Sequence, residues 1–419
     1  MADRPAARRV FLVGGYITSF RGRDKGSSDG DEPRGLRHYI NEAVRGALES
    51  SGVGGAAVDR IYVGNFAGEL FNSQGHLGAA LAGADRALLN KPSLRLEAAC
   101  ASGGLACSES VKAIRAGDDC ALAVGVEVQT SVDARTGGTY LARAADYKRQ
   151  GTIDDFLFPA LFARRVKAYT ERYPSCTMED IAAVAAKAYA NGNLNPKAHM
   201  HTRQLSLEKA KASPQFLSNT EYKPYLRVAD CSQVSDGGAA AIFMSEESMR
   251  RHGINPADAV EVLASDQGAG DLWSDPEDLT ELSTARAVVS RMLNTAGVTP
   301  QQLDVAEVHD CFAFSELLMY EAIGLAEPGR AVDFFRTGAT RLHGRIPVNT
   351  GGGLLAFGHP VGATGVKQVL EIFRQMKGRC GAYQMKRLPR LGLAVNMGGD
   401  DKTIAAMLLR NVLETNVKL

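Results

Sequence analysis

The chain has 419 residues, of which 45% are hydrophobic and 23% charged, and its formal net charge is +1. This length exceeds one ordinary hydrophobic core, so two domains or one duplicated domain is expected. The balanced charge argues against wholesale binding to nucleic acid or membranes, and no apolar run reaches the roughly 18 residues of a membrane span. The seven cysteines include no Cys-x-x-Cys pair, which disfavours a disulfide framework or a zinc site and favours a reducing compartment.

The two ends of the chain give little indication of targeting. Residues Met1–Arg9 are basic and lead directly into a strand-like run at residues 10–13, which leaves no room for a signal peptide or a long transit sequence. The C-terminal Lys418-Leu419 resembles the end of a Ser-Lys-Leu peroxisomal address, but Val417 stands where that address has a small residue. We expect a cytoplasmic protein if the source is bacterial. In a eukaryote, the peroxisome and the mitochondrion are the alternatives.

Two segments far apart in the sequence are alike. Residues 47–66 and 292–311 align in register, and each reads as a helix end, a glycine stop, a turn and a strand. The paired positions include Gly52 with Gly297 and Asp59 with Asp304. Each copy is followed by a Gly-rich turn, a helix and a buried strand. The pattern predicts an α/β fold of two duplicated halves, each with a mainly parallel sheet, and chance similarity of two ordinary α/β units is the alternative.

Residues 135–226 interrupt the repeat with charged helices, near 162–173 and 177–191, and with irregular polar stretches. We interpret them as an inserted loop region over one end of the sheets, where ligands bind in α/β folds. The expected domains are therefore 1–134 (first part of the N-terminal half), 135–226 (insertion), 227–258 (end of the N-terminal half) and 259–419 (C-terminal half). Six cations of the insertion are either phosphate contacts or solvated helix faces: Arg164, Arg165, Lys167, Lys187, Lys197 and Arg203.

The run Glu97–Gly104 contains the candidate nucleophile, Cys100. A short predicted strand at residues 94–96 is followed by small residues and then by a helix, a pattern typical of a nucleophile elbow. Cys100 would then lie at a helix N-terminus, where peptide dipoles stabilise a thiolate. A buried structural cysteine is the alternative.

Three further motifs lie in the second half. His309 and Cys311 occur in a Val-His-Asp-Cys-Phe segment directly after a predicted strand, where the sites of α/β proteins are found. His359 stands between glycine and proline in a loop too glycine-rich to be core, which makes it a candidate general base. The last motif runs from a strand into Gly398-Gly399, whose backbone N–H groups can face a ligand. A satisfied histidine, a buried cysteine and a plain tight turn are the alternatives.

In order and spacing, these four motifs resemble those of the thiolase superfamily over essentially the whole chain. The Cys-Ala-Ser-Gly elbow at Cys100, the Gly-His-Pro loop at His359 and the final Gly-Gly turn all match. Most thiolases carry an Asn-Glu-Ala-Phe segment and a second cysteine in the final turn, whereas this chain has His-Asp-Cys-Phe and Asn396. In this it resembles the sterol-carrier-protein-type thiolases, in which the cysteine of His-Asp-Cys-Phe takes over the role of that second cysteine. The resemblance implies the thiolase fold, with duplicated α/β halves in αβαβα layers.

The resemblance also implies an acyltransferase that cleaves 3-ketoacyl-CoA with CoA, or runs the reverse Claisen condensation, through an acyl-Cys100 intermediate. His359 would be the base, Cys311 the proton shuttle, and His309 with His359 the enolate site, while the N–H groups of Cys100 and Gly398 would hold the oxyanion. CoA would be a substrate, with no permanently bound cofactor and no metal, and the protein would form a homodimer or a dimer of dimers. The residues placed as CoA contacts are Phe162, Ser265 and Phe312.

Asp400-Asp401 departs from the family pattern, which has small residues there. Two carboxylates near a thiolate disfavour it unless they point away or are paired. Two other functions therefore stay open. One is a ketoacyl-synthase-like condensing enzyme that acts on carrier-protein thioesters, against which Cys311 and the Gly-His-Pro loop argue. The other is a catalytically weak thiolase-like binding or scaffold protein, against which the retained set of cysteines and histidines argues.

Overall fold

The computed structural model describes residues 8–23 and 34–412, so the candidate C-terminal address at 416–419 lies outside the described residues. In these two ranges, nine strands form one sheet in the order β3-β2-β4-β5-β1-β6-β9-β8-β7. The strands are β1 (Val10–Ile17), β2 (Arg60–Gly64), β3 (Ser93–Leu96), β4 (Cys120–Glu127), β5 (Gly237–Ser245), β6 (Val260–Ala269), β7 (Val305–Glu307), β8 (Leu391–Gly398) and β9 (Thr403–Asn411).

The sheet consists of two parts that meet at β1 and β6 through only two residue pairs, Phe11 with Glu261 and Leu12 with Val260. In the first part β3, β2 and β4 are parallel, and β5 and β1 are antiparallel additions. In the second part only β7 and β8 are parallel, and β9 and β6 are antiparallel. The prediction of a mainly parallel sheet is therefore wrong for the second half. The turn between β8 and β9 is too short for a crossover, so β9 can only return antiparallel.

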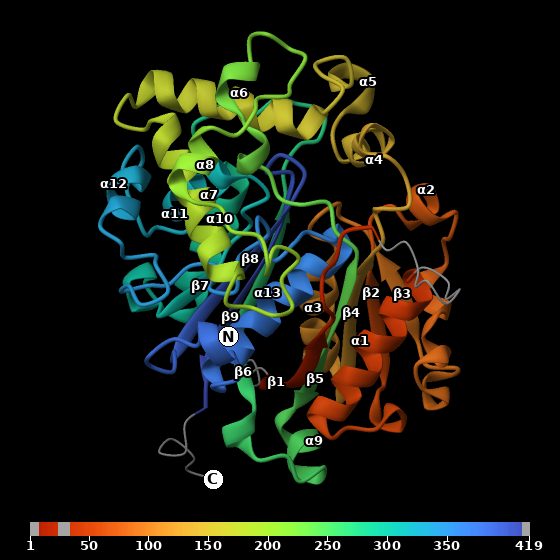
Figure 1. Cartoon of the computed structure of the whole chain (residues 1–419). Helices are drawn as coiled ribbons and strands as arrows, with labels where there is room; N and C mark the ends of the chain where they lie inside the picture. The colour runs from red at the N-terminus through yellow and green to blue at the C-terminus, as the bar shows by residue number, and fades with distance from the viewer. Residues whose placement is uncertain (1–7, 24–33, 413–419) are drawn as a thin grey trace, which may run out of the picture.

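Helices α3 (Ser102–Ala116) and α13 (Val361–Met376) lie between the two parts of the sheet (Figure 1). They pack on each other and on strands of both parts. Helix α1 (Leu36–Ser51) covers the outer face of the first part, and α10 (Ser283–Ala296) covers that of the second. The layers therefore run helix, sheet, helix, sheet, helix, which is the αβαβα arrangement predicted. Helix α13 is buried along nearly its whole length, as this central position requires.

The internal repeat is visible in local geometry. Gly52 after α1 and Gly297 after α10 both adopt a left-handed conformation, with φ of 66° and 64°. Only glycine takes this conformation without a steric cost, so each glycine ends its helix. The carboxylate of Asp59 accepts hydrogen bonds from the backbone N–H groups at the start of β4, and Asp304 does the same at β8. The two copies therefore share their connections as well as their order of elements.

Residues between β4 and β5 form the inserted region, which lies at one end of the sheet, at the top of Figure 1. Its helices are α4 (Ala134–Leu141), α5 (Tyr147–Gln150), α6 (Leu157–Arg172), α7 (Met178–Gly192) and α8 (Leu207–Lys211). The two helices predicted here are present as α6 and α7, and a reciprocal capping box of Thr177 and Asp180 begins α7. The expected domain boundaries at 134, 226 and 258 stay predictions. Among the described helices, none has the length and apolar character needed to cross a bilayer.

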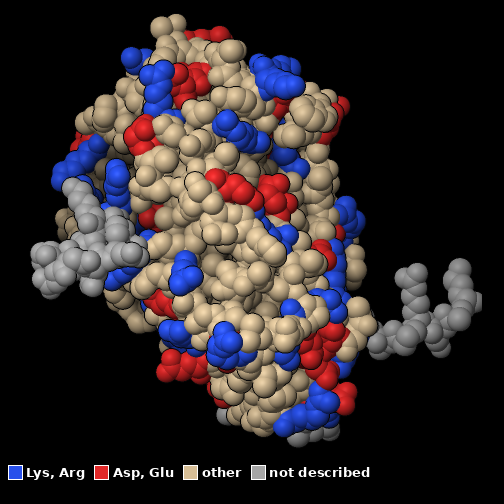
Figure 2. All heavy atoms as spheres, turned by 90° about the vertical axis from the view of Figure 1, so that its right-hand side faces the viewer, with Lys and Arg blue, Asp and Glu red and all other residues tan. Residues whose placement is uncertain are grey.

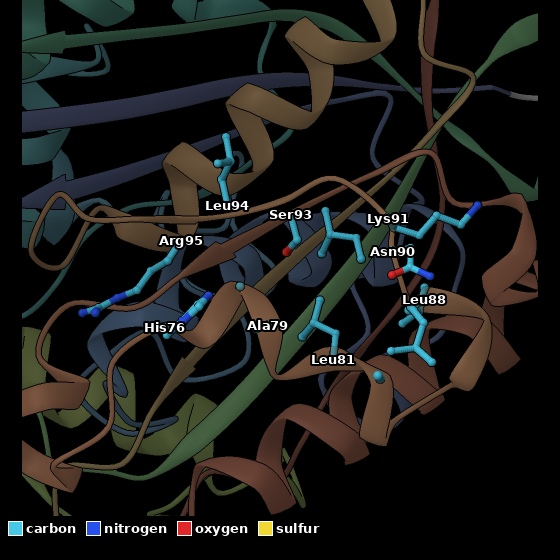
Figure 3. Close-up of a pocket in the computed structure, with 13 residues that line it drawn as sticks. His76, Ala79, Leu81, Leu88, Asn90, Lys91, Ser93, Leu94 and Arg95 are labelled. Carbon is cyan, nitrogen blue, oxygen red and sulfur yellow. The ribbon is translucent and has the colours of Figure 1, made fainter.

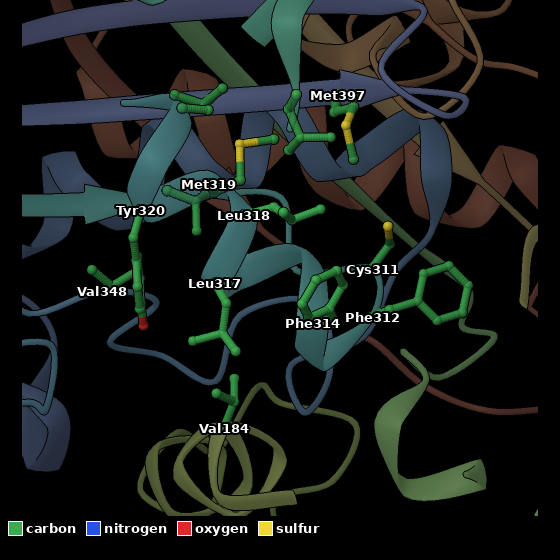
Figure 4. Close-up of a cluster of buried hydrophobic side chains, with 14 of the residues drawn as sticks. Val184, Cys311, Phe312, Phe314, Leu317, Leu318, Met319, Tyr320, Val348 and Met397 are labelled. Carbon is green, nitrogen blue, oxygen red and sulfur yellow. The ribbon is translucent and has the colours of Figure 1, made fainter. Parts of the chain in front are cut away.

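The largest hydrophobic cluster lies between this insertion and the second half of the chain. Its centre is α11 (Ala313–Ala322), which is buried at every position. Figure 4 shows Leu317 of this helix directed at Val184 of α7, while the preceding Phe312 points away from the helix. Because α11 begins directly after the His-Asp-Cys-Phe segment, its burial fixes that segment in place. The other helices are the short α2 (Gly68–Asn72), α9 (Glu246–Arg251) and α12 (Ala331–Arg336).

Within the part of the chain that the structure describes, β3 is the free edge of the first part of the sheet and pairs only with β2. Leu94 on this strand is 56% exposed. A hollow of about 500 Å³ lies beside β3, and Ser93 and Arg95 are among its lining residues (Figure 3). On the side of the molecule that carries β3, basic and acidic residues are interspersed around a central area of other residues (Figure 2). This face therefore carries no broad surface of a single charge.

Candidate active site

Cys100 lies in a sharp turn between β3 and α3. The preceding Ala99 has a φ of 51°, an uncommon conformation for a residue with a side chain. Two hydrogen bonds of Ser102 hold the turn, since its Oγ accepts from Ala98 N at 3.0 Å and donates to Ala99 O at 2.6 Å. The turn places Cys100 just before the first residue of α3, where unpaired backbone N–H groups gather. This is the elbow predicted from the small residues.

A cavity of about 560 Å³ opens onto this turn, and the four reactive side chains predicted from the sequence all line it: Cys100, His309, Cys311 and His359. The thiol of Cys100 and one ring nitrogen from each histidine lie within 4.8 Å of one another. The two imidazoles meet edge to face, with their centroids 5.1 Å apart. Aromatic and aliphatic side chains of the insertion supply much of the remaining wall, namely Leu141, Phe156, Phe158, Phe162 and Phe216.

The hydrogen bonds of His359 assign its tautomer. Its Nδ1 lies 2.7 Å from Thr364 Oγ1, and that hydroxyl also lies 3.0 Å from the carbonyl oxygen of Pro360. A carbonyl only accepts, so the single hydroxyl proton goes to Pro360, and Thr364 Oγ1 accepts from His359 Nδ1–H. His359 Nε2 therefore carries a lone pair, and it is buried with no hydrogen-bond partner among residues 8–23 and 34–412. Burial, with Lys367 nearby, lowers the pKa of His359 to about 3, so the ring is a neutral base near pH 7.

The thiol of Cys100 is also neutral at rest. Burial raises its pKa to about 12, although a hydrogen bond from the backbone N–H of Gly399 opposes this shift. Deprotonation therefore requires transfer to a neighbouring base during the reaction, and His359 Nε2 is within reach. One thiol and two imidazoles are also a ligand set that zinc accepts. In this site the Nδ1 lone pair of His309 is already occupied by Asn396, 3.2 Å away, which favours the nucleophile–base interpretation.

Cys311 supplies a second thiol at the same cavity. Burial raises its pKa well above the usual range, and the neighbouring Cys100 adds to the shift. Its Sγ lies 3.8 Å from Ser315 Oγ on α11, and its carbonyl accepts a hydrogen bond of 2.9 Å from Ser232 N. A neutral thiol held in this way can give a proton to a strongly basic carbon.

The two carboxylates that seemed incompatible with a thiolate are both satisfied elsewhere. Asp400 Oδ1 lies 2.5 Å from Nε of the fully buried Arg165. Asp401 accepts hydrogen bonds from Thr284 N at 2.8 Å and Ala285 N at 3.0 Å, so it caps the N-terminus of α10. Burial raises the pKa of Asp401 to about 6. The pair therefore stabilises the fold beside the site, and both carboxylates are engaged by partners other than Cys100.

Two of the predicted site residues do not line the cavity. Gly398, expected as an oxyanion donor, packs against the elbow and does not line the cavity, whereas Gly399 does. The strand ends at Gly398, and the left-handed turn at Gly399 directs the next N–H group at Cys100. Ser265, expected as a CoA contact, lies outside the cavity on β6, where its hydroxyl is 2.7 Å from Ser108 Oγ. Phe162 and Phe312 do line the cavity, and their rings are stacked with centroids 4.6 Å apart.

The cations considered as phosphate contacts are mostly engaged within the protein. Arg165 and Lys187 are buried, and Lys187 pairs with Glu316. Lys197 donates to a backbone carbonyl and lies over the ring of Tyr16. These three side chains are structural, because a buried or committed cation is not free for a ligand. Sequence alone could not separate them from solvated cations.

Comparison with known proteins places the chain in a family. The family model "Thiolase, N-terminal domain" matches residues 10–247, and "Thiolase C-terminal domain-like" matches residues 269–411. An acetyl-CoA acetyltransferase of Methanothermobacter thermautotrophicus is 36% identical over 88% of this chain and 93% of its own length. Sterol carrier protein 2 of Gallus gallus is 30% identical over 91% of this chain and 69% of its own length. Among solved structures, the "Ltp2-ChsH2(DUF35) aldolase" has a TM-score of 0.78 at 21% identity and covers 98% of this chain and 99% of that one.

The fold and the site define an α/β protein with two thiols and two imidazoles at one cavity. The matches are more specific, and the chain belongs to the thiolase family. It is an acyltransferase of the thiolase type. The likeness to the solved aldolase supports the fold alone, because the sequence identity of 21% is too low to carry its function to this chain.

Proposed function

We propose that the protein is a CoA-dependent thiolase that cleaves a 3-ketoacyl-CoA, or forms one by the reverse condensation, through an acyl-Cys100 intermediate. The observation that carries this proposal is the meeting of one thiol and two imidazoles within 4.8 Å at a cavity that a second thiol also lines. The chemistry needs a nucleophile, a base, a proton shuttle and sites for two oxyanions, and the cavity has a group for each.

In the cleavage direction, His359 Nε2 accepts the proton of Cys100 Sγ, and the thiolate attacks the ketone carbon. The backbone N–H groups of Cys100 and Gly399 hold the tetrahedral oxyanion. The C2–C3 bond then breaks and leaves an acyl thioester on Cys100 and the enolate of acetyl-CoA. Cys311 gives its proton to C2 of the enolate, and it takes a proton back from the thiol of the incoming CoA. That CoA thiolate attacks the acyl-Cys100 thioester and releases acyl-CoA, and the departing Cys100 thiolate takes its proton back from His359.

The cavity wall supports a thioester with an apolar acyl group. Phe156, Phe158 and Phe216 come from the insertion and line the same cavity as the catalytic side chains. We place the pantetheine arm beside the stacked rings of Phe162 and Phe312, where an extended, mainly apolar chain gains contact area. CoA is a substrate in this scheme, and no step requires a resident cofactor or a metal.

We propose further that two copies of the chain associate through β3. This strand is a free edge with an exposed leucine, Leu94, and an unpaired edge invites a second strand. Light scattering at micromolar concentration should give a dimer or a dimer of dimers, and Leu94→Lys should weaken it. A wild-type protein that is monomeric at this concentration would contradict the assembly.

The function is tested by thiolysis and condensation assays across acyl chain lengths, with Cys100→Ala as the matched variant. Wild-type enzyme should form an acyl adduct on Cys100 detectable by mass spectrometry, and Cys100→Ala should lose turnover by several orders of magnitude. Turnover of carrier-protein thioesters but not CoA thioesters would indicate the condensing enzyme instead. Cleavage that proceeds without added CoA would indicate an aldolase. Normal turnover by folded Cys100→Ala would refute the covalent mechanism.

A further inference from the structure

Asn396 stands where most thiolases have a second cysteine, and the proposed mechanism gives it no proton to move. Both polar atoms of its amide are nevertheless hydrogen-bonded. Oδ1 accepts from Gly104 N at 3.1 Å, while Nδ2 lies 3.0 Å from the carbonyl oxygen of Cys100 and 3.2 Å from Nδ1 of His309. The residue is 2% exposed. A side chain buried and bonded in this way has one fixed orientation.

The partners determine which end of the amide is which. Gly104 N–H can only donate and the Cys100 carbonyl can only accept. A flipped amide would point its NH₂ group at the Gly104 N–H and its oxygen at the Cys100 carbonyl oxygen, so neither hydrogen bond could form. Space for the amide comes from both central helices. A Cβ on Gly104 of α3 would lie 2.8 Å from Asn396 Oδ1, and a Cβ on Gly365 of α13 would overlap the same atom. The amide is therefore seated in a pocket shaped for it.

This orientation assigns the protons of His309. The Nδ2 group donates one hydrogen to Cys100 O and its other hydrogen to His309 Nδ1, so that Nδ1 is an acceptor and the ring proton sits on Nε2. A second ring proton on Nδ1 would face the amide hydrogens directly. Burial and the nearby His359 hold the pKa of His309 well below its usual value, which keeps this neutral form.

We infer that Asn396 is a positioning residue that holds His309 as the Nε2–H tautomer. The two histidines then carry opposite tautomers. His359 has its proton on Nδ1 and offers a lone pair to Cys100, whereas His309 has its proton on Nε2 and offers a hydrogen-bond donor to an oxyanion. The same amide fixes the carbonyl of the nucleophile residue. This inference rests on the proposed function for its catalytic consequence, but the tautomer itself does not depend on it.

The test uses full-length enzyme labelled with 15N-histidine, without substrate. Long-range 15N–1H correlation spectra distinguish a protonated ring nitrogen from an unprotonated one, and the His309→Gln variant identifies the His309 signals by their loss. In the wild type we expect Nε2–H for His309 and Nδ1–H for His359. In Asn396→Asp, a carboxylate oxygen faces His309 Nδ1, so the proton should move to Nδ1. Turnover should fall about 10²–10³-fold, as for loss of one oxyanion donor.

The matched control is Asn411→Asp, the same amide-to-carboxylate change at a buried asparagine whose Nδ2 donates to Met376 O and Pro389 O outside the cavity. It should keep the wild-type tautomers and turnover within about twofold. Three results overturn the inference: Nδ1–H on wild-type His309, an unchanged tautomer in Asn396→Asp, or a changed tautomer with unchanged turnover. If Asn396→Asp does not fold, the wild-type spectrum alone decides. An enzyme inactive on every CoA thioester that still shows the expected tautomers refutes the proposed function and leaves the assignment of His309 standing.

Discussion

The substitution Gly398→Ala tests whether close packing of β8 on the elbow positions Cys100. A Cβ at this position would overlap the carbonyl oxygen of Ala98 and lie 3.2 Å from the Cβ of Ala101. Both neighbours belong to the turn that carries the nucleophile, so relief of the overlap moves either that turn or the strand by on the order of 1 Å. A displacement of that size at a reacting centre costs about 10²-fold in rate, and overpacking costs about 1–3 kcal/mol of stability.

The assay compares kcat and KM for thiolysis with the thermal midpoint of the same variant. We expect kcat to fall about 10²-fold while KM changes little, because the overlap involves Ala98 and Ala101 of the elbow and neither of the rings placed beside pantetheine. The control is Gly54→Ala, at a glycine with φ of −74° and nothing within 4 Å of the added Cβ. It should leave both quantities near wild type. Wild-type kcat in folded Gly398→Ala would show that the contact does not position Cys100.

Three further predictions concern proton transfer and the buried charges. Cys311→Ala should still acylate at Cys100 but should slow hydrogen–deuterium exchange into the methyl group of acetyl-CoA about 10²–10⁴-fold, and wild-type exchange would show that another group moves that proton. The pKa of His359 is lowered to about 3 in the folded protein, whereas a histidine of the unfolded chain takes up a proton below about pH 6.5. Between these two values the unfolded state binds one more proton than the native state, so the free energy of unfolding should fall as the pH falls from about 6.5 to about 3. Its kcat/KM profile should accordingly lack an inflection near pH 6.5, and an inflection there would contradict the assignment. Arg165→Leu should lower the free energy of unfolding in denaturant by about 3–5 kcal/mol, because Asp400 loses this buried partner. The double variant with Asp400→Leu should recover part of the loss. Equal stabilities of the wild type and Arg165→Leu would mean that the pair is not desolvated.

Local patterns predicted the parts of the fold that depend on neighbouring residues. The glycine stops at Gly52 and Gly297 required only a left-handed turn after a helix, and the structure has both. The small residues around Cys100 predicted its elbow, because a sharp turn needs small side chains. The many apolar residues of α11 suit its buried position, but no local pattern encodes which surfaces cover it.

Features that depend on distant contacts could not be predicted in this way. The antiparallel direction of β9 and the choice of Gly399 over Gly398 follow from how one short turn is oriented against the elbow. The sequence marks Asn396 only as an amide at the position where most thiolases have a second cysteine. Its actual contacts join positions almost 300 residues apart, and no local spacing encodes them. Ser265 was placed by analogy in the chain order, and the register of β6 puts it elsewhere.

The two halves hold each other's reactive residues. Asn396 on β8 of the second half bonds the carbonyl of Cys100 in the first. In the opposite direction, the buried Glu127 and Gln129 at the end of β4 accept hydrogen bonds from the N–H groups of Gly362 and Val361, which begin α13 directly after the loop of His359. Neither Cys100 nor His359 is therefore positioned by its own half of the chain alone. A duplicated fold that places its site at the junction gains precision from the large buried contact between the halves, because any slip of one half moves both reactive groups out of line.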